Sequence, residues 1–385
     1  MPPTLITIFL RGGADTLNLV IPYADDAYYH ARPTLAIKAP SRNGSDAACA
    51  VRLDDRYGLH PALSPLEPLF KEGRLGIVQS VGLKDNTSGS HFECQDQMEH
   101  GDSAEGRAAG GGWLGRYLRT QSGAKTSALS AIAIGTVLPE SLRGAPSVSV
   151  LEKLQDIAIK TSTGKSDAVV AALSALYGSD ATMLGQRGLQ TIDLFQRVAA
   201  LHETQSPPAN GAEYPKGAFG DGLREVARLI RARVGLEIAC IDLPGWDSHF
   251  VQGAATGQLA GNAATLAAGL AALDLDLKQE RANYTVLVMT EFGRRVYENA
   301  SLGTDHGRGF ACMAIGDNVR GGKVHGPWPV VPINETDPDP RGPGGVVIEH
   351  DIRDVFIEVL RGTMGLSDAS TVFPGYAAKP VGLVG

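Results

Sequence analysis

Carboxylates, imidazoles and hydroxyls gather in four short segments that contain glycine or serine. Three of these segments, 11–15 (RGGAD), 245–249 (GWDSH) and 303–307 (GTDHG), lie where apolar, strand-like runs are expected to end, and the fourth, 88–93 (SGSHFE), supplies hydroxyls at the start of an expected helix. Carboxylates and imidazoles on glycine-rich loops are suited to a divalent metal ion. A serine at a helix N-terminus is suited to act as a nucleophile. The four segments together indicate a metal-assisted hydrolase.

Asp247 and His249 are the firmest candidates for metal ligands. They are two residues apart, so in an extended segment both side chains point to the same side and can reach one ion. Asp305 and His306 are adjacent in another glycine-rich loop, where they can serve one ion, two neighbouring ions, or a ligand with its orienting partner. The alternative for each pair is an ordinary surface loop.

Asp15 and Glu291 are further candidate ligands, each with a structural alternative. Asp15 follows two glycines and is either a ligand or a turn residue that caps its own backbone. Glu291 directly follows an apolar run and is either a ligand or the partner of Arg294 or Arg295. Arg294 is also a candidate for binding phosphate or sulfate oxygens, because its planar guanidinium donates parallel hydrogen bonds.

Ser90 is the candidate nucleophile, and it also fits a simple capping role. With Glu93 three residues later it matches a capping box, in which the serine caps the helix and the glutamate reaches back. The same position places the hydroxyl at the positive end of the helix dipole, which stabilises an alkoxide or a bound anion. Thr87 and Ser88 are reserve hydroxyls, and His91 is either a base or a ligand. Local sequence favours the cap.

Strands and helices alternate along the chain, which predicts an α/β fold with an open, largely parallel sheet covered by helices on both sides. Ligands in such sheets bind beyond the carboxyl ends of the strands, where Asp15, Asp247 and Glu291 are expected. We expect one domain over residues 1–385, with a mainly helical region at about 113–234 that flanks or caps the sheet. The expected strands are 4–10, 75–81, 236–243, 285–290 and 310–315, and the expected helices include 61–72, 90–99, 257–278 and 352–362.

The composition is that of an ordinary globular protein. The 385 residues are 43% hydrophobic and 20% charged, and the formal net charge of -7 gives no reason to expect nucleic acid as a partner. No apolar run approaches the roughly 20 residues that span a bilayer, so no membrane partner is expected. The four cysteines are scattered and show no CxxC spacing, so neither a structural zinc site nor a disulfide framework is indicated. With no basic and apolar leader, we expect a cytoplasmic protein, or an exported one if a leader precedes this sequence.

Seven blocks of the sequence resemble one protein family. The blocks FLRGGADTLNLVIPY, YGLHPAL, SHFECQDQMEHG, GGWLGRYL, TEFGRR, TDHGRG and VRGGKVHGPWP, in this order, are similar to the domain-of-unknown-function family 1501. That family is regarded as part of the alkaline phosphatase and sulfatase superfamily. The resemblance therefore implies a three-layer α/β/α sandwich, a nucleophile at a helix N-terminus and one or two divalent metals.

The superfamily also implies an order of site residues: an early aspartate, then the nucleophile, then aspartate and histidine ligands. Asp15, Ser90, Asp247, His249 and His306 follow that order. The sulfatase signature CxPxR does not occur, so a formylglycine sulfatase is not expected. The resemblance predicts a metal-dependent hydrolase of a phosphate or sulfate ester, acting on a small molecule or glycan with zinc, manganese, magnesium or calcium. Phosphoryl transfer or lyase chemistry on the same fold, or a non-catalytic metal- or glycan-binding protein, remain alternatives.

Overall fold

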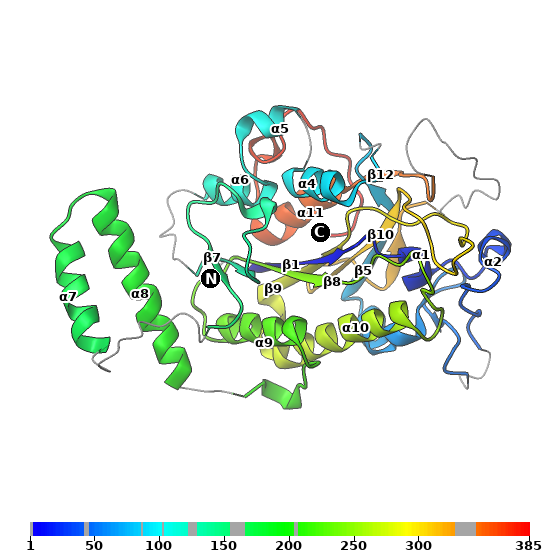
Figure 1. Cartoon of the computed structure of the whole chain (residues 1–385), viewed down its shortest axis with the longest axis horizontal. Helices are drawn as coiled ribbons and strands as arrows, with labels where there is room; N and C mark the ends of the chain where they lie inside the picture. The colour runs from blue at the N-terminus through cyan, green and yellow to red at the C-terminus, as the bar shows by residue number, and fades with distance from the viewer. Residues whose placement is uncertain are drawn as a thin grey trace.

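A nine-stranded sheet forms the centre of the protein (Figure 1). The computed structural model describes residues 3–41, 46–85, 88–101, 104–121, 129–154, 166–203, 207–327 and 344–385. Along the sheet the strand order is β11 (Lys323–His325), β5 (Leu75–Gly82), β10 (Phe310–Gly316), β9 (Tyr284–Met289), β1 (Thr4–Arg11), β8 (Ile238–Pro244), β6 (Ala131–Ile134) and β7 (Ser149–Leu151), and β12 (His350–Asp351) also pairs with β5. All pairings are parallel except the two made by β10.

Helices cover both faces of this sheet, and alternation along β1 shows why. Ile6, Ile8 and Leu10 point into a core shared with α9 (Ala218–Arg231) and α10 (Gln258–Asp276). Leu5 and Phe9 point into a second core, shared with α6 (Trp113–Thr120) and α11 (Ile352–Met364). Successive side chains of a strand face opposite sides, so a strand that is apolar at nearly every position needs a helical layer on each face. In Figure 1 these layers lie below and above the sheet. The predicted three-layer α/β/α sandwich with a largely parallel sheet is confirmed.

Smaller elements surround the three layers. A second sheet has the strand order β2 (Val20–Ile21), β4 (Gly58–Leu59) and β3 (Val51–Arg52). The other elements are α1 (Thr16–Leu19), α2 (Asp26–Ala31), η1 (Pro61–Leu66), α3 (Glu67–Lys71), α4 (His91–His100), α5 (Ala104–Ala109), η2 (Glu140–Leu142), α7 (Ser166–Gly178), α8 (Met183–Glu203), η4 (Ala209–Gly211), η5 (Lys278–Asn283) and η6 (Ala369–Thr371). None of the described helices is long and apolar enough to cross a membrane.

The region 113–234 is less uniformly helical than expected, because it contributes β6 and β7 to the sheet. These strands are only four and three residues long. Such short apolar runs cannot be distinguished from helix by periodicity, and the alanines of β6 favour helix by propensity. The predicted helical parts are present as α7, α8 and α9. In Figure 1, α7 and α8 lie side by side at one end of the molecule.

Candidate metal centre

The polar loops meet at the carboxyl edge of the sheet. Asp247 follows β8 and Glu291 follows β9, and both strands run parallel to β1, which lies between them. His91 begins α4, the helix that follows β5. The 303–307 loop does not follow a strand as expected but leads into β10. Because β10 runs antiparallel to its neighbours, its first residues reach the same edge.

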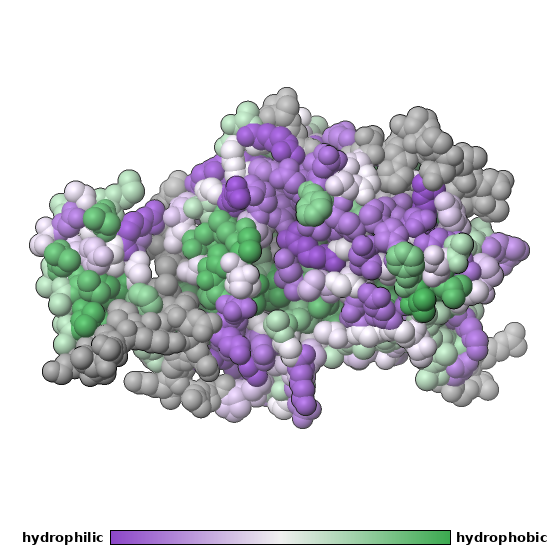
Figure 2. Space-filling view, in the orientation of Figure 1, coloured by the Kyte–Doolittle hydropathy of each residue, from purple (hydrophilic) through white to green (hydrophobic). Residues whose placement is uncertain are grey.

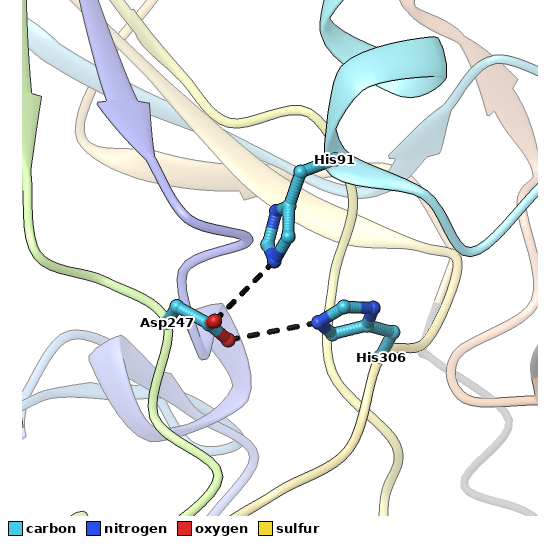
Figure 3. Close-up of side chains that lie close together, drawn as sticks. All are labelled: His91, Asp247 and His306. Carbon is cyan, nitrogen blue, oxygen red and sulfur yellow. Dashed lines mark ion pairs between the residues drawn. The ribbon is translucent and has the colours of Figure 1, made fainter.

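Three of the predicted side chains, His91, Asp247 and His306, form a cluster at this edge (Figure 3). Their ligand atoms all lie within 4.8 Å of one another. The Nε2 atoms of His91 and His306 lie 3.5 and 3.6 Å from the carboxylate oxygens of Asp247. A fourth group joins from the Asp247 loop, since Nε2 of His249 is 3.2 Å from Oδ1 of Asp247 and 2.9 Å from Nε2 of His306. We call these four residues the candidate metal centre, shortened below to the metal centre.

Each histidine of the metal centre is held by its other ring nitrogen. Nδ1 of His91 is 2.9 Å from Glu291 Oε1, and Nδ1 of His249 is 2.9 Å from Asp305 Oδ1. Nδ1 of His306 is 2.7 Å from the carbonyl oxygen of Gly89. A carbonyl or carboxylate oxygen accepts a proton but has none to donate, so Nδ1 carries the proton in every case. In the neutral rings, the Nε2 lone pairs therefore face the Asp247 carboxylate, which is the tautomer that binds metals.

Glu291 and Asp305 thus orient histidines in this structure. Oε1 of Glu291 accepts from Gly12 N–H at 2.9 Å and from Gln95 Nε2 at 2.8 Å, in addition to His91. Burial would raise the pKa of the Glu291 carboxyl, but the hydrogen bonds from His91 and Gln95 hold that pKa below its usual value. Glu291 is therefore ionised at neutral pH and keeps the His91 ring in one tautomer. Both carboxylates were predicted as ligands, whereas their oxygens are here engaged with these donors.

Arg294 links the 11–15, 245–249 and 303–307 loops next to the metal centre. Its guanidinium is fully buried and donates to the carbonyl oxygens of Gly12, Gly13 and Thr304 and to Asp247 Oδ1 at 2.6 Å. Burial would raise the pKa of Asp247, but the hydrogen bond and charge of Arg294 hold it below its usual value. The expected role, binding substrate oxygens, does not match a guanidinium enclosed by protein acceptors. Arg294 instead keeps Asp247 ionised and in place.

Asp15 lies in a different environment from the metal centre. Its carboxylate is fully buried and makes two hydrogen bonds with Arg32, at 2.6 and 3.0 Å, and a third with Gln252 Nε2 at 2.6 Å. The structure does not place it among the converging ligand atoms. The glycines before it have a packing role, because a Cβ on Gly12 would lie 2.4 Å from the backbone nitrogen of Asp247. The 11–15 loop therefore packs directly against the backbone of Asp247, one of the residues of the metal centre.

Ser90 is the N-cap residue of α4, but its side chain makes no capping hydrogen bond. The expected capping box is replaced by Ser88, whose hydroxyl accepts from the Ser90 N–H at 3.0 Å and bonds to Glu93. Both neighbours of Ser90 belong to the metal centre or contact it. His91 is one of its four residues, and the Gly89 carbonyl accepts a hydrogen bond from His306. The backbone of Ser90 is thus held at the edge of the centre. Thr87, the other reserve hydroxyl, lies outside the described residues.

The donor atoms of the metal centre fit a divalent cation. The His91 Nε2 is buried and has no hydrogen-bond partner among the described residues. Three imidazoles and one carboxylate are the ligand types of zinc and similar borderline ions. The partners that orient these ligands, including the Gly89 carbonyl, Gln95 and Asn299, were not singled out from the sequence. The Gly89–His306 and Gln95–Glu291 contacts join residues 217 and 196 positions apart, so no local pattern marks these two contacts.

Comparison with known proteins identifies one family, and two distant structures are among those that match. The family model described as "Protein of unknown function (DUF1501)" matches residues 3–341. A crystal structure of Ps i-CgsB in complex with k-i-k-neocarrahexaose is 12% identical, with a TM-score of 0.37 over 84% of this chain and 68% of that one. The PsFucS1 sulfatase from Pseudoalteromonas sp. is 11% identical, with a TM-score of 0.39 over 100% of this chain and 73% of that one. No curated protein matches.

Proposed function

The chain belongs to the DUF1501 family of proteins of unknown function, and we propose that it is a metal-dependent hydrolase of a phosphate or sulfate ester. The observation that carries the proposal is the convergence of the His91, His249 and His306 Nε2 atoms on the carboxylate of Asp247. Each ring is fixed by an acceptor at Nδ1, and one Nε2 is buried without a hydrogen-bond partner among the described residues. A metal ion bound between these donor atoms would account for that arrangement.

The proposed centre holds one ion rather than two. Two-metal hydrolysis needs a second set of ligands about 3.5–4 Å from the first ion. Glu291 and Asp305, the carboxylates nearest to these histidines, are engaged in orienting His91 and His249, and Asp15 is paired with Arg32. This leaves the three imidazoles and the Asp247 carboxylate, whose Oδ1 also accepts from Arg294, as the donors for a single ion. The metal of such a set, when bound, polarises an ester oxygen and lowers the pKa of a nearby hydroxyl or water.

Ser90 is the proposed nucleophile. Its oxygen bonds to the phosphorus or sulfur of the ester as the bond from that atom to the alcohol oxygen breaks. The hydroxyl proton passes through solvent to the departing alcohol, and water then releases phosphate or sulfate from Ser90.

The position of Ser90 supports this assignment, since it lies between Gly89 and His91 and its hydroxyl makes no capping hydrogen bond. The first backbone N–H groups of α4 lack partners within the helix, and they are well placed to stabilise negative charge on the substrate. His91 is committed to Glu291 through Nδ1, so it acts as a ligand in this proposal and not as a free base.

Metal content and turnover test the proposal together. The purified full chain should hold about one divalent ion per molecule by mass spectrometry, and it should hydrolyse members of a panel of aryl phosphates and sulfates. Ser90→Ala should reduce kcat by several orders of magnitude with metal content unchanged. Ser88→Ala is the matched control, because its hydroxyl is already bonded to Glu93 and to the Ser90 N–H. Full activity of Ser90→Ala would remove the nucleophile assignment.

A metal-loaded protein that turns over no ester in the panel would favour one of the alternative functions. Phosphoryl transfer within a sugar or a lyase reaction would keep the metal centre and change the chemistry. A non-catalytic metal- or glycan-binding protein would keep the metal and show binding alone. A protein without bound metal, in which Asp247→Asn changes neither stability nor ligand binding, would exclude the metal centre itself.

A further inference from the structure

Two loops beside the metal centre present apolar side chains to solvent. Phe250 follows His249, and the centroids of the two rings are 6.4 Å apart. Val251 N–H donates to the Ser301 carbonyl at 2.9 Å and Gln252 N–H to the Leu302 carbonyl at 2.9 Å, so the two loops run side by side. Phe250, Val251 and Leu302 are 72%, 70% and 47% exposed. We call these three residues the apolar lip.

The backbone of the apolar lip is strained in a way that packing does not explain. Val251 has φ 43° and Leu302 has φ 58°, which is the left-handed region that favours glycine or asparagine. A β-branched residue is rare there, because its Cβ crowds the backbone. Burial of these side chains does not offset the free-energy cost of the strained backbone, since both side chains are substantially exposed. Strain of this kind concentrates at functional sites.

Asn299 joins the apolar lip to the metal centre. Its Nδ2 donates to the His249 carbonyl and to Asp305 Oδ1, each at 3.0 Å, and its Oδ1 accepts from the Ser301 and Gly303 N–H groups. Asp305 in turn holds the His249 ring. The lip is therefore fixed relative to the metal-binding nitrogens. Phe92, the residue after His91, is also exposed, so a second apolar side chain directly follows a histidine of the centre.

We propose that the apolar lip binds the alcohol part of the ester substrate, and that this alcohol contains a ring whose apolar face packs against the lip. This proposal rests on the proposed function. The three side chains offer neither hydrogen-bond donors nor acceptors, and the Phe250 ring supplies a flat surface for stacking. Figure 2 shows that hydrophilic side chains cover much of the surface between α4 and α10, with hydrophobic groups standing out from it. Exposed apolar side chains next to a polar centre are typical of a ligand subsite. Aryl and pyranose rings both have the required face.

Phosphonates test the lip separately from the chemistry, because their carbon–phosphorus bond is not hydrolysed. With the metal-loaded full chain, calorimetry should show phenylphosphonate binding at least tenfold tighter than methylphosphonate. Phe250→Ala should reduce that ratio to below about threefold, with unchanged metal content and unchanged methylphosphonate affinity. Leu176→Ala, an exposed apolar side chain on α7, is the matched control and should leave the ratio intact. A pyranosyl phosphonate that binds more tightly than phenylphosphonate would identify the ring as a sugar.

Val251→Gly gives a second test, in which stability and ligand preference should change in opposite directions. It should raise Tm, because glycine adopts a positive φ without strain, and it should lower the preference for phenylphosphonate. A preference ratio near one in the unchanged protein, or an unchanged ratio in Phe250→Ala, would overturn the proposal. A dimer that Phe250→Ala dissociates would overturn it in favour of a second copy covering the lip. If methylphosphonate, methylsulfonate and metal all fail to bind, the proposed function fails first, and the lip with it.

Discussion

The Nε2 atoms of His249 and His306 lie 2.9 Å apart. Both Nδ1 atoms face oxygen acceptors, Asp305 for His249 and the Gly89 carbonyl for His306. Burial lowers the pKa of His306, so its ring is neutral at pH 7 and presents a lone pair at Nε2. If the His249 ring is also neutral, its Nε2 directs a second lone pair toward the Nε2 of His306. Two facing lone pairs at this distance need a cation between or beside them, either a proton or a metal ion.

Removing one of these rings should abolish tight metal binding. We expect His306→Ala to weaken the affinity for zinc or manganese by more than about 100-fold, because it removes one of four ligands, a larger change than loss of an orienting group. The affinity is measured by competition with a chromogenic chelator. His30→Ala, an exposed histidine of α2, is the control and should bind metal like the unchanged protein. Equal affinity in both variants would contradict the assignment of His306.

Glu291 should act on metal affinity through His91. We expect Glu291→Gln to weaken binding by about 10–100-fold, because an amide no longer supplies the charge that fixes the Nδ1–H tautomer of His91. The same competition assay measures the loss, and Asp305→Asn should give a similar change through His249. Asp96→Asn on α4 removes a half-exposed carboxylate and serves as the control. A loss as large as that of His306→Ala would make Glu291 a direct ligand instead.

The sequence was sufficient to predict five strands of the sheet, the helical layers and the polar loops, whereas the short strands β6, β7, β11 and β12 were not predicted. Long apolar strands such as β1 and β9 are readable because both of their faces are buried. The contacts of the carboxylates were only partly predictable, since an orienting role was considered for the Asp305 and His306 pair but not for Glu291. The contact of Glu291 with His91 joins residues 200 positions apart, which no local pattern encodes. Arg32, the partner of Asp15, was missed for the same reason.

Asp15 should contribute to stability and leave metal binding unchanged. Asp15→Asn leaves the fully buried Arg32 guanidinium without its countercharge, which we expect to lower the free energy of unfolding by about 3–5 kcal/mol. Urea denaturation measures this change, and Asp26→Asn, an exposed residue of α2, should cost less than about 0.5 kcal/mol. Folded Asp15→Asn protein that has lost its metal would show instead that Asp15 is a ligand, as its position in the sequence suggested.

His60 should make stability depend on pH in a defined direction. Its Nδ1 accepts from the Ala62 N–H at 3.0 Å, and Nε2 donates to the Ala254 carbonyl at 3.0 Å, so the ring is neutral in the folded protein. Burial lowers the pKa of His60 below its usual value, against weaker opposing effects of the Ala254 carbonyl and Asp15. The unfolded chain therefore binds the proton more readily. The contribution of neutral His60 to the free energy of unfolding is fully present above the unfolded-state pKa of about 6.5, and it is lost as the pH falls through the lower folded-state pKa.

Replacing His60 with asparagine should remove this contribution. Asparagine keeps an oxygen that can accept from the Ala62 N–H, but it does not titrate in this range. We expect the loss of unfolding free energy between pH 7.5 and 5.5, measured by urea denaturation, to be smaller in His60→Asn than in the unchanged protein. His30→Asn, an exposed histidine, should keep the original dependence. The three proteins differ only at the replaced histidine, so a smaller slope in His60→Asn alone is assigned to His60. An identical slope in His60→Asn would show that protonation of His60 does not destabilise the fold.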